Sequence, residues 1–135
     1  MHMKDRALIE TELELVRNQR KTKRLRWIHP ESMRGAEDAL DWILAGRPSP
    51  APLSDEWRDP TDALQVQREA DVAQEVRQGL GARRRLSKKA DTGFLGEYAE
   101  GVSETLGWAC GVLEFDAMGR DDDDIRDEAE ALVGH

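Results

Sequence analysis

Apolar residues recur at helical spacing through most of this chain, and no segment shows the sustained alternation of apolar and polar positions that a half-buried strand requires. β-Branched residues are also sparse, so we expect no sheet. The predicted fold class is all-α, with four or five helices in a compact helical bundle. The helices are expected at residues 3–28, 31–45, 60–79 and 92–115, with a short terminal helix after the aspartates at 121–124.

The helix predicted at residues 3–28 is the least uniform of these. Apolar residues recur near its start and near its end, but residues 17–24 (RNQRKTKR) contain no apolar side chain. A helix without an apolar face over two turns has nothing to bury there. We therefore expect a long N-terminal helix that is partly exposed or lies on a partner.

The prolines mark the ends of helices and one internal connection. Pro30 ends the first helix, because the residue before a proline is biased away from helical geometry. Gly46 is placed to cap the second helix. The stretch PSPAPLS, residues 48–54, holds three of the five prolines and predicts an extended linker. A length of 135 residues favours a single domain that includes this linker and spans residues 1–135.

One phrase occurs twice along the chain. GAEDALDW, residues 35–42, returns as GVSETLGW, residues 101–108. The glycines predict a close approach of helices, the leucines a place in the core, and the tryptophans a place at its edge, where they cover the core or meet a second subunit. We interpret the phrase as a packing unit used twice. The matched pairs are Gly35 and Gly101, Asp38 and Glu104, Leu40 and Leu106, and Trp42 and Trp108.

Charge is distributed unevenly along the chain, whose formal net charge is −8. Residues 1–89 hold 18 basic and 15 acidic residues, whereas residues 90–135 hold 2 and 13. The acidic C-terminal segment, residues 116–135, could therefore attract the more basic part of the chain or a separate partner.

Two basic segments, residues 17–26 and 83–89, are the main candidates for binding. Such surfaces neutralise nucleic-acid phosphates without reading sequence. The alternatives are a solvated helix surface or pairing with the acidic C-terminal segment, and a pI near 4.9 argues against a dedicated nucleic-acid binder. With two tryptophans, the candidate interaction surface comprises Arg17, Arg20, Lys21, Lys23, Arg24, Arg26, Arg83, Arg84, Arg85, Trp42 and Trp108.

Residues that could carry catalysis are scarce. The only cysteine, Cys110, falls on an apolar helix face, and His29 has no nucleophile or carboxylate at a motif spacing. The acidic tail lacks the ligand spacing and central glycine of a calcium loop. We expect a non-enzyme without a cofactor or a metal. No apolar run approaches the roughly 20 residues of a membrane span, and no signal-peptide core is present, so we expect a cytoplasmic protein that does not bind membranes.

Residues 34–48, RGAEDALDWILAGRP, carry a phrase of the form G-x-x-D-A-L-x-W-x-L-x-G. In this phrase the chain resembles small uncharacterised helical proteins encoded by actinobacterial phages. The resemblance implies a phage or prophage origin and a place in the host cytoplasm or the virion, and it supplies no catalytic residue. We expect a protein that acts by binding another protein, as an accessory or assembly factor or as an inhibitor of a host system, and that forms homo-oligomers. Nucleic-acid binding is the alternative.

Overall fold

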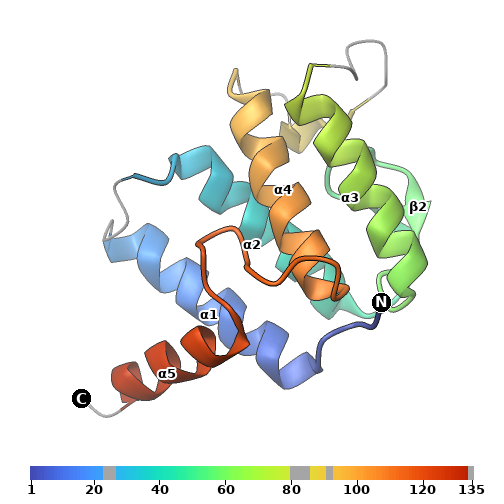
Figure 1. Ribbon diagram of the computed structural model, residues 1–135. Coiled ribbons are helices and arrows are strands. Elements are labelled where there is room, and N and C mark those ends of the chain that lie inside the picture. The colour runs from blue at the N-terminus through green and yellow to red at the C-terminus, as the bar shows by residue number, and fades with distance from the viewer. Residues whose placement is uncertain (23–26, 80–85, 91–92, 134–135) are drawn as a thin grey trace.

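The computed structural model describes residues 1–22, 27–79, 86–90 and 93–133, and within them the fold is all-α (Figure 1). The central helix, α4, packs against α2 on one side and α3 on the other, while α1 packs on α2 and α5 on α1. The described helices are α1 (Arg6–Thr22), α2 (Pro30–Ala45), α3 (Ala63–Arg77), α4 (Leu95–Ala109) and α5 (Asp122–Val133), with a 3-10 turn, η1 (Lys88–Ala90).

Most helices are shorter than the periodicity predicts. α2 is the exception, because the sequence carries a clear signal at each of its ends. Its first turn carries Pro30, and the His29 side chain accepts a hydrogen bond from the Glu31 N–H at 3.0 Å. Its end is capped by Gly46, which takes the left-handed conformation at φ 69°. The helix predicted at 92–115, by contrast, ends at Ala109, since the chain turns sharply at Gly111 with φ 79°.

The expectation of no sheet was wrong in one place. β1 (Ser49–Pro50) and β2 (Trp57–Arg58) form a short antiparallel pair. The proline-rich stretch at 48–54 is therefore one side of a small hairpin that folds back on itself, and not an extended linker.

A buried carboxylate fixes this hairpin to α3. Glu69 is fully buried and accepts hydrogen bonds from the Leu53 N–H at 3.0 Å and the Ser54 N–H at 2.9 Å. The Ser54 hydroxyl donates to it at 2.6 Å and the Arg58 guanidinium at 3.0 Å. Charged carboxylates accept strong hydrogen bonds from such donors. Glu69 thus satisfies backbone groups of the loop and lets Leu53 enter the core, where none of its surface is exposed.

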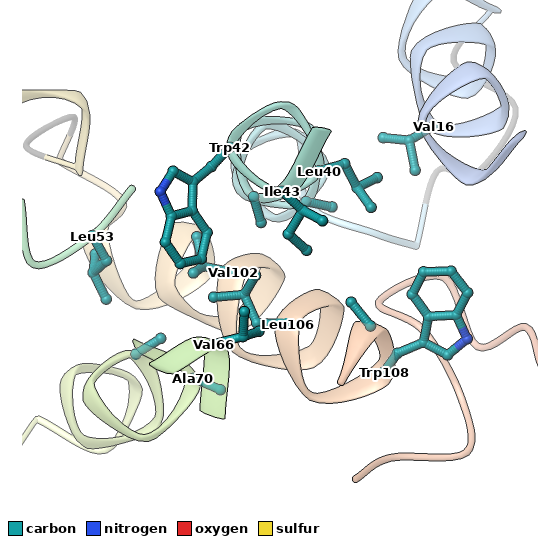
Figure 2. Close-up of a cluster of buried hydrophobic side chains, with 14 of the residues drawn as sticks. Val16, Leu40, Trp42, Ile43, Leu53, Val66, Ala70, Val102, Leu106 and Trp108 are labelled. Carbon is teal, nitrogen blue, oxygen red and sulfur yellow. The ribbon is translucent and has the colours of Figure 1, made fainter. Parts of the chain in front are cut away.

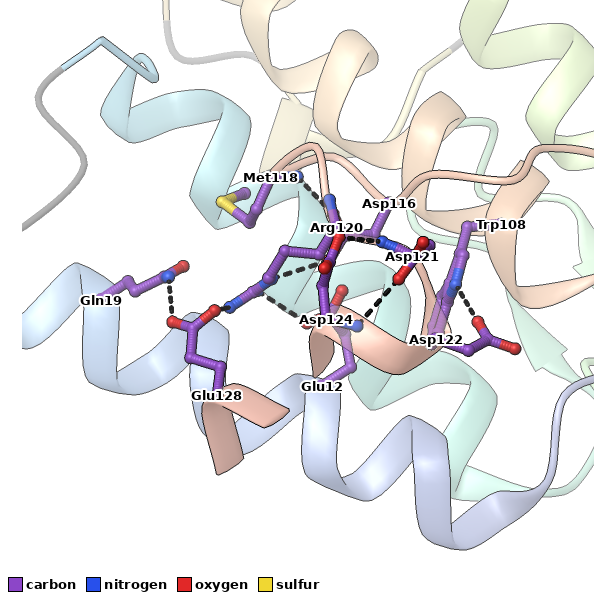
Figure 3. A network of polar contacts seen from close by, with 10 residues as sticks. All are labelled: Glu12, Gln19, Trp108, Asp116, Met118, Arg120, Asp121, Asp122, Asp124 and Glu128. Carbon is purple, nitrogen blue, oxygen red and sulfur yellow. Dashed lines mark hydrogen bonds and ion pairs between the residues drawn. The ribbon is translucent and has the colours of Figure 1, made fainter. Parts of the chain in front are cut away.

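The core surrounds α4 (Figure 2). Leu40 and Leu106 are completely buried, which confirms the core role predicted for the repeated leucines. The tryptophans were predicted to cover the core or to meet a second subunit, and within the chain both are buried, since Trp42 is only 6% exposed and Trp108 not at all. Trp108 lies at the far end of α4 and donates its indole N–H to Asp122 at 2.9 Å, so the start of α5 covers it (Figure 3).

The repeated glycines allow α2 and α4 to touch through their backbones. A methyl group at Gly35 would lie 2.3 Å from the carbonyl oxygen of Tyr98, and one at Gly101 would lie 1.9 Å from that of Ser32. The predicted close approach is confirmed at these two positions. Tyr98 precedes Gly101 by three positions, and Ser32 precedes Gly35 by three positions. The contact is therefore reciprocal: each glycine lies against the helix turn just before the other glycine. The other glycines of α4 do not share this contact.

Candidate protein-binding groove

An open groove of about 1050 Å³ runs beside α4. Its walls are the N-terminal end of α2, the facing sides of α3 and α4, and the loop at residues 110–121 that follows α4 (Figure 1). The volume lies at the upper end of the usual range for small-molecule sites, about 300–1000 Å³. Its open form suits a segment of another macromolecule better than an enclosed small ligand.

Large apolar side chains line the groove and remain exposed to solvent. Phe115 is 49% exposed, Val112 50%, Leu113 41% and Trp27 77%. These are four of the ten large hydrophobic residues that are exposed in the described part of the chain, so a good share of its exposed apolar surface gathers at one place. Contiguous exposed apolar surface with a polar rim is typical of interaction sites. We call Val112, Leu113 and Phe115 the apolar wall.

The backbone places the apolar wall tightly against the end of α4. The N–H groups of Val112 and Leu113 both donate to the carbonyl oxygen of Gly107, at 2.9 and 3.0 Å. The Leu113 side chain lies over Gly107 itself, where a methyl group would come within 2.7 Å of it. The missing side chain at Gly107 thus leaves room for the Leu113 side chain in this position.

A buried charge network holds the other end of the same loop (Figure 3). Arg120 is 6% exposed and reaches Asp116 at 3.2 Å, Glu12 of α1 at 2.7 Å and Glu128 of α5 at 2.9 Å. Asp116 also accepts the N–H groups of Met118 at 2.9 Å and of Arg120 at 2.7 Å. Burial raises the pKa of Asp116, although Arg120 opposes the shift. A loop fixed by charged hydrogen bonds at one end and by Gly107 at the other presents its apolar residues in a defined position.

The lining of the groove is also acidic. Five carboxylates that are at least partly exposed line it, and Arg77 is the single arginine among the described lining residues. Arg77 lies 3.2 Å from Glu104 and 3.8 Å from Glu100, so its charge is already shared. Burial and the charge of Glu100 raise the pKa of Glu104, and Arg77 offsets this only in part. The five are Asp71, Glu97, Glu100, Glu104 and Glu114.

The basic residues singled out from the sequence have other positions. Arg17 pairs with Glu37 at 3.1 Å and with Asp41 at 2.8 Å, and Arg20 also pairs with Glu37. This part of the basic run therefore fastens α1 to α2 and does not pair with the acidic C-terminal segment. Lys21 is exposed and has no ion pair with any residue in the described ranges. Outside the described residues lie Lys23, Arg24, Arg26, Arg83, Arg84 and Arg85.

Trp42 and Trp108 were predicted to belong to an interaction surface, and the burial of both removes them from the surface of the single chain. Sequence reasoning missed the groove itself, because residues 92–115 were expected to form one helix, with no loop folding back after Ala109. The sequence did contain one signal for an exposed loop. The three apolar residues of the apolar wall follow Gly111 and are interrupted by the charged Glu114.

Cys110 and His29, the residues considered for catalysis, have structural roles. Burial raises the pKa of Cys110, which favours the unreactive thiol. The His29 side chain caps α2 and packs against Phe94 in a tilted arrangement, with ring centroids 4.7 Å apart. Among the residues that the structure describes, no three His, Cys, Asp or Glu side chains are grouped to hold a metal ion. None of the described helices is long and apolar enough to cross a membrane.

Comparisons with family models, with curated proteins and with solved structures give no match for this chain. The groove and its side chains therefore carry the proposal for where this chain binds a partner.

Proposed function

We propose that the chain is a non-enzymatic protein-interaction protein, and that it holds a segment of a partner protein in the groove beside α4. The observation that carries the proposal is the apolar wall, whose three large side chains stay exposed although the loop that bears them is fixed at both ends. Exposing such residues has no benefit for folding, because fully burying a large apolar side chain gives about 1.5–3 kcal/mol and roughly half of that gain is left unrealised at each of these positions. A partner that covers them would recover part of that energy.

The setting of this activity follows from the resemblance at residues 35–46. It supports a phage origin, action in the host cytoplasm or in the virion, and a role as an accessory or assembly factor or as an inhibitor of a host system. Homo-oligomer formation remains part of the proposal, although the paired glycines do not contribute to it. Gly35 and Gly101 are used for contact within the chain, so a second copy would have to bind exposed surface instead.

Nucleic-acid binding, by contrast, has no specific support in the described residues. Arg17 and Arg20, which open the basic run, are paired with carboxylates of α2. Phosphates would have to displace these partners.

Site-specific photo-crosslinking tests the proposal. A photoreactive amino acid is placed at Phe115 in one variant and at Leu64 in a control, since both side chains are 49% exposed and Leu64 does not line the groove. In actinobacterial extracts we expect discrete protein adducts from position 115 that disappear when Val112→Asp is added. Adducts that are the same from both positions, or none from position 115, would contradict the proposal.

A further inference from the structure

Within the part of the chain that the structure describes, the lining of the groove carries more negative than positive charge. Asp71, Glu97 and Glu114 form no ion pair with any residue that the structure describes. The one arginine of the lining, Arg77, is shared between two glutamates that compete for it. Like charges held close together repel one another, and added positive charge would relieve that repulsion.

Three of the acidic residues follow one face of α4. Glu97, Glu100 and Glu104 are spaced by three and four residues, so their side chains leave the helix on the same side. At 1.5 Å of rise per residue, the row extends over about 10 Å. The apolar wall lies along the same groove, on the loop that folds back from the end of α4. The groove therefore offers an acidic row and an apolar wall to whatever lies in it.

Trp27 adds a third feature to the lining. Its side chain is 77% exposed and belongs to the groove, just before the start of α2. The face of an indole attracts lysine and arginine side chains, with about 0.5–1 kcal/mol per contact at exposed sites. Trp27 thus attracts positively charged side chains, as the carboxylates do.

We infer that the occupant of the groove is a basic amphipathic segment of the partner protein, with lysine or arginine side chains toward the acidic row of α4 and large apolar side chains toward the apolar wall. This inference rests on the proposed function and adds the chemistry of the partner. An amphipathic helix that enters a groove with its apolar face is a common mode of peptide recognition. Complementary charge then selects the partner and speeds its association.

An unbiased selection tests this chemistry. Random peptides of about 15 residues, long enough to span about 22 Å as a helix, are displayed on their encoding RNA and selected on the full chain. The same library is selected on Phe115→Asp, and on Leu64→Asp as a control of equal exposure. Groove-dependent peptides are those retained by the wild-type chain and by Leu64→Asp but lost on Phe115→Asp.

We expect the groove-dependent peptides to be enriched in lysine and arginine, and in large apolar residues spaced three and four positions apart, as on the two faces of an amphipathic helix. Groove-dependent peptides that are neutral or acidic would overturn the inference and leave the proposed function intact. A selection without any groove-dependent peptide would overturn both. Light scattering of the free chain completes the test, because a groove occupied by a second copy, seen as a dimer that Phe115→Asp dissociates, would also overturn the inference.

Charge variants then localise the basic side of the best peptide. We expect its affinity, measured by fluorescence anisotropy, to fall at least about tenfold on Glu97→Lys with Glu100→Lys, which corresponds to about 1.4 kcal/mol. The matched control is Asp127→Lys with Glu130→Lys, which makes the same change of net charge on exposed positions of α5. An equal loss in both variants would show attraction to the acidic chain as a whole and would contradict an acidic row in the groove. Circular dichroism establishes that each variant is folded.

Discussion

The backbone contact between α2 and α4 makes a sharp prediction for Gly101→Ala. The new methyl group would lie 1.9 Å from the carbonyl oxygen of Ser32 and 2.7 Å from its carbonyl carbon, whereas real contacts of this kind essentially never fall below 3.0 Å. Both atoms belong to the backbone of α2, so no side chain can turn aside to make room. The two helices must move apart by roughly 1 Å at the centre of the core.

The expected cost follows from two opposing effects. Overpacking of a well-filled core costs about 1–3 kcal/mol, and a rigid backbone neighbour places this case at the upper end. Alanine gains about 1 kcal/mol over glycine in a helix interior. We therefore expect a net loss of about 2 kcal/mol in the free energy of unfolding. For a chain of this length, that loss should lower the melting temperature by about 6–10 °C.

The matched control is Gly96→Ala in the same helix. Nothing lies within 4 Å of a methyl group at Gly96, so only the gain in helix propensity applies. We expect this variant to be as stable as the wild-type chain or up to about 1 kcal/mol more stable. Urea and thermal denaturation followed by circular dichroism measure both variants. A Gly101→Ala variant as stable as Gly96→Ala would refute the close contact of α2 and α4.

Three further predictions concern the buried polar groups and the charged surface. Arg120→Met leaves Glu12 and Asp116 buried without their cation and should cost about 3–5 kcal/mol in urea denaturation at neutral pH. Burial raises the pKa of Asp116 in the folded state and Arg120 opposes that rise, so Arg120→Met should raise this pKa further. The folded variant then takes up a proton at a higher pH than the folded wild-type chain, and its deficit should shrink as the pH falls; a deficit that grows would contradict this. Tyr98→Phe removes a hydrogen bond of 2.8 Å to Asp38 from a fully buried ring and should cost about 1–2 kcal/mol, and no loss would contradict a stabilising role of this hydrogen bond. In gel-shift assays we expect no retardation of DNA or RNA by the wild-type chain at low salt, and a salt-dependent shift would instead favour nucleic-acid binding.

Local signals in the sequence were sufficient for the helices with strong ends. Pro30 and Gly46 define α2 in sequence and in structure, and the repeated leucines enter the core as their spacing predicts. The paired glycines also predicted a close contact between helices. They did not reveal the partner helix, because a glycine shows only that space is needed and not which element fills it.

Long-range contacts account for what the sequence did not reveal. Glu69 looks like a surface residue of α3, yet it is buried because the hairpin supplies four hydrogen-bond donors. Trp108 looks like an edge residue until Asp122 of α5 closes over it. The groove depends on the same kind of contact. The apolar wall lines it because the loop after α4 folds back and bonds to the carbonyl oxygen of Gly107. None of these pairings has a local pattern that could have predicted it.

The reciprocal contact of Gly35 and Gly101 has the symmetry of an isologous dimer interface, in which each half offers the same patch to the other. Here one chain supplies both halves, 66 residues apart. The two positions consequently report on a single interface. Once Gly101→Ala has forced the helices apart, adding Gly35→Ala should cost less than it does alone, and a double-mutant cycle would show this as a coupling energy between the two glycines.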